Sequence, residues 1–166
     1  MNGVVYQFNL KPKTPGERGI PKFPVDHLYL STLGEISHDK QGIDFNRLRA
    51  EKKKGTIDRA VLLLPLETIL DLQHEEWNVE AGHLGENITT QGIFHYQLAL
   101  GQRYQIGQVI LELTEPCKPC ANLAILPYIG EGRVANFVQT LIGRRGWYAK
   151  VIQDGRITVG NKITLL

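Results

Sequence analysis

The chain has 166 residues and a mass of 18.7 kDa, a length that favours one domain with a core large enough to be stable without disulfides. Hydrophobic residues make up 42% and charged residues 22% of it, an ordinary globular composition that excludes a disordered or fibrous chain. With 19 basic and 17 acidic residues, the formal net charge of +2 is too small to indicate binding to nucleic acid or to a membrane surface.

The start of the chain is predicted to form a strand and a loop. Residues 4–8 are a short apolar strand, and the Pro/Gly-rich residues 11–24 are a loop. Residues 1–19 lack the apolar stretch of a secretion signal, and no uncharged apolar run is long enough for a membrane helix. The only cysteines, Cys117 and Cys120, are too close together for a disulfide framework and fit a reducing compartment. We therefore expect a soluble, cytoplasmic protein.

The middle of the chain predicts two strands and two helices. Residues 60–64 are a continuous apolar run, which is typical of a strand buried on both faces. Residues 65–77 repeat apolar side chains at helical spacing, with proline at a tolerated first-turn position. Residues 109–113 are predicted to form another strand, and residues 132–142 repeat the helical spacing.

The end of the chain predicts strands joined by tight turns. Residues 147–152 and 156–159 flank Asp154-Gly155, a dipeptide that suits a type I′ turn, so they are predicted to pair as a hairpin. A second turn at Gly160-Asn161 leads into a last strand, residues 162–166. Many short strands with two or three short helices favour a mostly-β barrel over a doubly wound sheet.

The most distinctive local motif is the pair Cys117 and Cys120, separated by Lys-Pro. A Cys-x₂-Cys pair supplies half of a tetrahedral zinc site, and the other ligands would have to be histidines. The histidines are His27, His38, His74, His83 and His95. None of them pairs with another at the spacing of a zinc finger.

Three other interpretations of the cysteine motif remain open. A C-x-P-C sequence after a strand resembles the thioredoxin redox motif, although there the motif opens a long helix, and here Pro127 follows closely. A single exposed thiolate with Lys118 beside it could instead carry sulfur or bind a soft metal. The structural alternative is that both cysteines are small buried hydrophobes.

Two polar segments and one basic run are further candidates. The segment from Gly82 to Thr90 carries polar side chains that could orient a ring or a phosphate, or it could be a turn that enters a strand. The adjacent Arg144 and Arg145 suit an anion, or end a solvated loop. The lysines at 52–54, near Arg47, Arg49 and Arg59, lack interleaved aromatics and are better explained as a solvated loop than as a nucleic-acid site.

Taken in order, several segments of this chain resemble the MOSC domain, a family named for the C-terminal domain of molybdenum cofactor sulfurases. The matching segments are GERGIPKFPV (16–25), DRAVLLLPLE (58–67), HLGENITTQGI (83–93), ELTEPCKPC (112–120) and RRGWYAKV (144–151). They cover nearly the whole chain and are most similar to stand-alone bacterial members. The resemblance implies a single MOSC domain over residues 1–166 with a mostly-β, barrel-like fold.

The resemblance also implies a functional thiol, which maps onto Cys120 and not onto Cys117. In the family, this cysteine either carries sulfane sulfur or ligates molybdenum in the pterin cofactor, and we expect polar side chains and arginines near it. The polar residues are Glu86, Asn87 and Thr89, and the arginines expected to neutralise the cofactor phosphate are Arg59, Arg144 and Arg145.

Two departures from the family pattern stand in the sequence. A His-Gly-Gly stretch that many members carry before the DRAV segment is replaced by residues 53–57, and the near-terminal Gly-Asp is Gly160-Asn161 here.

Two versions of the activity follow from the resemblance. As a molybdenum-cofactor protein, the chain would be an oxidoreductase that reduces N-hydroxylated substrates with a flavin or iron–sulfur electron donor. As a sulfur carrier, it would act as a sulfurtransferase with a separate pyridoxal phosphate-dependent cysteine desulfurase, since this chain carries no pyridoxal phosphate lysine motif. The alternatives are a non-enzymatic docking module for a molybdoenzyme or a desulfurase, and a dithiol redox protein. Neither nucleic acid nor a membrane is an expected partner.

Overall fold

Strands make up most of the regular structure in the computed structural model, which describes residues 2–11, 19–38 and 56–166. The strands are β1 (Asn2–Leu10), β2 (Phe23–Val25), β3 (His27–Leu30), β4 (Ile36–Ser37), β5 (Val61–Pro65), β6 (Ile88–Gln91), β7 (Arg103–Ile106), β8 (Val109–Pro116), β9 (Trp147–Gln153), β10 (Gly155–Thr158) and β11 (Lys162–Leu165). The helices are α2 (Leu66–His74), α3 (Gly130–Thr140) and the short 3₁₀ segments η1 (Thr56–Arg59), η2 (His95–Gln97) and η3 (Ala121–Ile125). The basic run at 52–54, with Arg47 and Arg49, lies outside the described residues.

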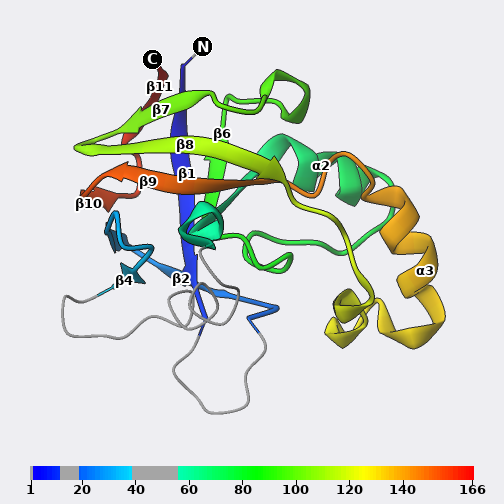
Figure 1. Cartoon of the computed structure of the whole chain (residues 1–166). Coiled ribbons are helices and arrows are strands. Elements are labelled where there is room, and N and C mark those ends of the chain that lie inside the picture. The colour runs from blue at the N-terminus through cyan, green and yellow to red at the C-terminus, as the bar shows by residue number, and fades with distance from the viewer. Residues whose placement is uncertain (1, 12–18, 39–55) are drawn as a thin grey trace.

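Seven strands close into a barrel. Their order is β11-β7-β8-β9-β5-β6-β1, and β1 pairs back onto β11, while β2 extends the sheet from the far end of β1. All neighbours are antiparallel except β5 and β6, whose parallel pairing needs a crossover, and α2 supplies it. The predicted mostly-β barrel is therefore confirmed (Figure 1).

The interior of the barrel holds one hydrophobic cluster, and a second lies under the two helices. In β5 all five residues are buried, as predicted for an apolar run without alternation, because one face packs into the barrel and the other against the helices. Leu63 belongs to the first cluster and Leu64 to the second. Both helices lie on the same side of the barrel in Figure 1, so the second cluster forms a separate layer there.

Both predicted helices are confirmed, with shifted ends. Helix α2 ends at His74, three residues before the predicted end. Glu76 takes a left-handed φ of 65°, and the amide of Trp77 then bonds to the carbonyl of Leu72. This closure ends the helix. No helix in the described ranges is long and apolar enough to cross a bilayer.

The predicted hairpin between residues 147–152 and 156–159 is wrong. β9 lies between β8 and β5 in the barrel sheet and pairs with both. β10 instead pairs with β3 in a separate three-stranded sheet of order β10-β3-β4. A type I′ turn requires positive φ at both central residues, and the φ of Gly155 is not positive. The carboxylate of Asp154 instead accepts a hydrogen bond from the amide of Thr32, 2.6 Å away, where the chain passes between the sheets. The turn at Gly160-Asn161 is confirmed, with a φ of 83° at Gly160.

Candidate functional site

The two cysteines differ in exposure. β8 ends at Pro116, opposite Trp147 of β9, and the amide of Cys117 donates to the carbonyl of Gly146 at 2.8 Å. This bond places the cysteine loop, residues 117–120, beside the Arg-Arg-Gly segment, residues 144–146. Cys117 is buried and Cys120 is exposed, and both are free thiols. Cys120 has an extended backbone and precedes η3, which has five residues.

Arg145 is almost completely buried, with 6% of its surface exposed. Its Nε and Nη1 atoms are buried and have no hydrogen-bond partner. Its charge acts on the buried carboxyl group of Glu86, which has one oxygen without a partner. Buried guanidinium donors are normally paired, so these atoms need an explanation.

The other two arginines that the sequence singles out are already bound to carboxylates. Arg59 donates to both oxygens of Glu115, its Nη2 atom at 2.8 Å, and lies 5.4 Å from the ring centre of Tyr148. Arg144 donates to both oxygens of Glu75, at 2.7 and 2.5 Å, and holds the pKa of that carboxyl below its usual value. The roles predicted for these two arginines at a cofactor phosphate would require that phosphate to compete with a carboxylate.

Glu86, Asn87 and Thr89 form part of a buried hydrogen-bond network. Glu86 accepts from the Gly82 amide at 2.5 Å and from the Thr89 hydroxyl at 3.0 Å. Thr89 in turn accepts from the side chain of Asn9 at 3.2 Å. The Asn87 side chain accepts from the Leu62 amide at 3.1 Å and donates to the carbonyl of Asn9. The network therefore fixes the entry into β6, which agrees with a turn that enters a strand.

Glu86 should make stability depend on pH. Burial raises its pKa above the ordinary 4.5, although the Gly82 and Thr89 hydrogen bonds and the Arg145 charge oppose this. The folded chain then holds a proton that the unfolded chain releases, so this contribution to stability is complete below pH 4.5 and is lost as the pH rises towards the folded-state pKa.

Glu86→Gln removes this titration. In urea unfolding from pH 4 to 7, the wild type should lose stability relative to Glu86→Gln as the pH rises, by up to about 1.4 kcal/mol per pH unit. Parallel stability curves for the two proteins would contradict a raised pKa.

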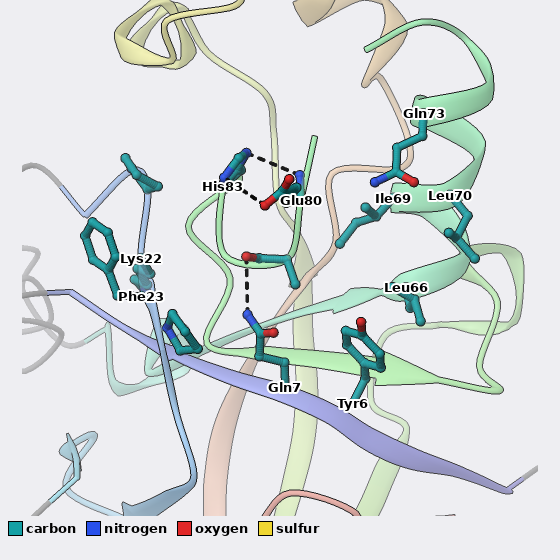
Figure 2. Close-up of a pocket in the computed structure, with 13 residues that line it drawn as sticks. Tyr6, Gln7, Lys22, Phe23, Leu66, Ile69, Leu70, Gln73, Glu80 and His83 are labelled. Carbon is teal, nitrogen blue, oxygen red and sulfur yellow. Dashed lines mark hydrogen bonds and ion pairs between the residues drawn. The ribbon is translucent and has the colours of Figure 1, made fainter. Parts of the chain in front are cut away.

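A cavity of about 560 Å³ opens beside this network (Figure 2). One wall is α2 and the floor is β1, with Tyr6 and Gln7, while the opposite wall carries Lys22 and Phe23. The amide of Gln7 donates to Asn9 at 2.6 Å and to the carbonyl of Ala81 at 3.3 Å, which links the cavity floor to the buried network.

His83 and Lys22 line this cavity; the sequence indicated His83 only as a possible zinc ligand and gave Lys22 no role. The Nδ1 atom of His83 accepts from the Glu80 amide at 3.2 Å and lies 3.0 Å from the hydroxyl of Tyr128. Lys22 is 6% exposed, and its amide donates to Gly82 at 2.8 Å. The sequence could have indicated both residues by their position, since each falls inside a segment that resembles the MOSC domain.

The model of the MOSC domain family matches residues 50–164, more than half of the chain. The chain belongs to the MOSC domain family. The barrel described above is thus the scaffold of a MOSC protein.

Three relatives are similar in sequence to this MOSC protein. YflK of Bacillus subtilis is 29% identical over 118 residues, which cover 68% of this chain and 50% of YflK. YiiM of Escherichia coli is 24% identical over 137 residues, which cover 80% of this chain and 60% of YiiM. A protein named reductase from Gibberella moniliformis is 32% identical over 88 residues, 52% of this chain and 15% of the reductase. The match therefore spans only about half to three fifths of the two bacterial relatives.

Crystal structures support the fold. YiiM from Geobacillus stearothermophilus has a TM-score of 0.73 at 22% identity, covering 99% of this chain and 75% of that one. The YUAD protein from Bacillus subtilis has a TM-score of 0.75 at 16% identity, covering 98% of this chain and 94% of that one. At these identities the likeness establishes the shared fold.

Proposed function

We propose that this MOSC protein binds an anionic molybdopterin-type cofactor, or holds sulfur destined for one, with Cys120 as the thiol and Arg145 as the cation. The family takes its name from molybdenum cofactor sulfurases, and one relative is named a reductase, so a molybdenum-cofactor-related role fits. The observation that carries the proposal is the buried Arg145 with two unpartnered nitrogen atoms beside the anchored cysteine loop.

The available donors fit such a group. Unpaired buried donors cost free energy, and a phosphate that accepted from the Arg145 guanidinium would recover it. Cys120 follows Cys117 by three residues, so the Cα atoms of the two cysteines lie within about 11 Å of each other. Because the amide of Cys117 is bonded to Gly146, Cys120 stays in the neighbourhood of the Arg-Arg-Gly segment. Its exposed thiol is the kind of soft ligand that suits molybdenum.

In the cofactor-binding form, each residue of the site has a separate task. Arg145 holds the phosphate, and the Cys120 thiolate ligates the metal. The bound cofactor supplies the two-electron redox chemistry, for which the proposed substrates are N-hydroxylated compounds and the proposed donor is a flavin or iron–sulfur protein. The cavity of about 560 Å³ at His83 and Lys22 has the size of a small-molecule site, but neither Cys120 nor Arg145 lines it, so we assign it no part of the cofactor.

In the sulfur-carrying form, Cys120 accepts sulfur from a cysteine desulfurase. The Cys120 thiolate attacks the outer sulfur of the desulfurase persulfide, a new S–S bond forms on Cys120, and the desulfurase cysteine leaves as a thiolate. The transfer involves no net oxidation or reduction. Cys120 then holds one sulfane sulfur for delivery to a cofactor.

Metal analysis of purified variants tests the cofactor-binding form. Protein from a cofactor-producing host should contain molybdenum near one atom per chain, and Cys120→Ser and Arg145→Met should each lower it at least about tenfold, since one charge-assisted contact contributes about 1.5–3 kcal/mol. Arg103→Met is the matched control, because Arg103 is exposed and pairs with Glu112 on β7 and β8, so it should retain the metal.

If the purified wild type contains no molybdenum, the sulfur-carrying form is tested instead. Incubation with a desulfurase and cysteine should then add about 32 Da, one sulfur atom, to the wild type and nothing to Cys120→Ser. The proposal is overturned if the wild type gains neither metal nor sulfur. It is also overturned if Cys120→Ser gains as much of either as the wild type does. A stable complex with a molybdoenzyme or desulfurase that survives Cys120→Ser, with neither gain, would indicate a docking module.

A further inference from the structure

Asp26, His27 and His38 come together at the small sheet, although the sequence offered these histidines only as partners for the cysteines. Asp26 precedes β3, His27 begins it, and His38 directly follows β4, which pairs with β3. The Nδ1 atom of His27 and the Nε2 atom of His38 each lie 2.8 Å from the same oxygen of Asp26. The two imidazole ring centres are 4.1 Å apart.

We propose that Asp26, His27 and His38 bind one divalent transition-metal ion of the zinc type, at a site separate from Cys120. One donor atom from each of the three residues lies within 4.8 Å of the other two. In the described part of the chain, the cysteine pair belongs to no such group of three potential ligands. Two imidazoles and a carboxylate form a ligand set typical of zinc and of other divalent metals, with coordination positions left open.

The spacing of the donor atoms suits a metal after a small adjustment. Zinc–ligand distances of about 2.0–2.1 Å place tetrahedral ligand atoms roughly 3.3 Å apart. The present nitrogen–oxygen distances of 2.8 Å are shorter by about half an ångström, a shift that side-chain rotation can supply. A metal ion would replace the two N–H···O bonds that now converge on Asp26.

The surroundings hold two of the three ligands in place. The carbonyl of Asp26 accepts from the Val159 amide at 3.2 Å, and His27 is in register with Thr158 of β10. The ring of Tyr29 meets that of His27 edge-on, with centres 5.6 Å apart, and only 16% of the His27 side chain is exposed. Such fixed ligands lower the ordering cost of metal binding.

The same cluster is open to solvent. The side chains of Asp26 and His38 are 79% and 46% exposed, which leaves a path for an ion. A cavity of about 510 Å³ is lined by Tyr29 and Ser37, which neighbour the cluster in sequence, although none of the three proposed ligands lines it.

Titration of chelator-treated protein with Zn²⁺ tests the site. We expect the wild type to bind one ion per chain by calorimetry and to gain several degrees in Tm, while His27→Gln and His38→Gln weaken binding at least tenfold and abolish the gain. His74→Gln, an exposed histidine on α2, is the matched control and should bind as the wild type does. The side chain of His27 is more buried than that of His38, so the His27→Gln variant could fail to fold. The His38→Gln variant would then still show whether the cluster binds the metal.

Cysteine ligation is the competing explanation, and Co²⁺ separates the two. Cobalt bound at the cluster should lack the intense near-ultraviolet band of thiolate ligation, and Cys120→Ser should bind it unchanged. The proposal is overturned by loss of binding in Cys120→Ser, by unchanged binding in both histidine variants, or by no binding up to about 1 mM metal. None of these outcomes depends on whether the protein carries molybdenum or sulfur.

Discussion

Gly146→Ala should lower the free energy of unfolding by about 3 kcal/mol or more, because position 146 is constrained twice. Its φ of 92° is one that side chains rarely adopt, and an added Cβ would overlap the carbonyl oxygen of Leu63 on β5. The carbonyl of Gly146 also anchors Cys117, so any backbone shift that relieves the overlap would move the cysteine loop. Chemical denaturation with circular dichroism measures the loss.

Gly143→Ala is the matched control for this substitution. Gly143 has a similar φ of 80°, but nothing lies within 4 Å of a Cβ built there. Its replacement should therefore cost only the conformational penalty of about 1–2 kcal/mol. Equal losses in the two variants would show that the close approach to β5 has no energetic consequence.

Phe137→Ala should cost about 3–5 kcal/mol, the usual range for deleting a buried aromatic ring. Phe137 is fully buried in α3, and its ring centre lies 4.7 Å from that of Trp77, which follows α2. Arg133 covers the Trp77 ring at 4.4 Å, so loss of Phe137 would loosen several contacts between α3 and the segment after α2.

The control for Phe137 lies one position earlier in the helix. Asn136 is exposed, and Asn136→Ala should change stability by no more than about 0.5 kcal/mol. A thiol reagent adds a second readout, since the wild type should show one fast thiol, the exposed Cys120, and one slow thiol, the buried Cys117. In Phe137→Ala we expect Cys117 to react faster, because a less stable chain unfolds more often and each unfolding exposes the buried thiol. Unchanged stability and unchanged thiol reactivity would together contradict the packing argument.

Elements with a strong pattern over several residues could be predicted from the sequence. The run at 60–64 could be predicted as a strand because both of its faces are buried. The helices α2 and α3 could be predicted because each has one buried stripe of apolar side chains. The hairpin at Asp154-Gly155 was mispredicted because a turn dipeptide reports local preference, whereas the choice between partners depends on residues far away. Strands as short as β4, with two residues, carry no pattern to detect.

The candidate site could be predicted as a set of residue types but not as a set of roles. Arg144 and Arg145 are adjacent and chemically identical, yet one pairs with Glu75 and the other is buried with unpartnered nitrogen atoms. Cys117 and Cys120 differ in the same way, one buried and one exposed. Neighbouring side chains in an irregular segment point in different directions, and only the fold decides which of them reaches a given neighbour.

The pairing of β1 with β11 makes this barrel late to assemble during synthesis. Asn2 is in register with Thr164, so the ring cannot close until nearly the last described residues have left the ribosome. Contacts of such long sequence separation are the slowest to form. Until then β1 and β7 both present an unpaired edge that invites pairing with other chains. Conditions that slow translation of residues 162–165 should therefore favour aggregation of this protein.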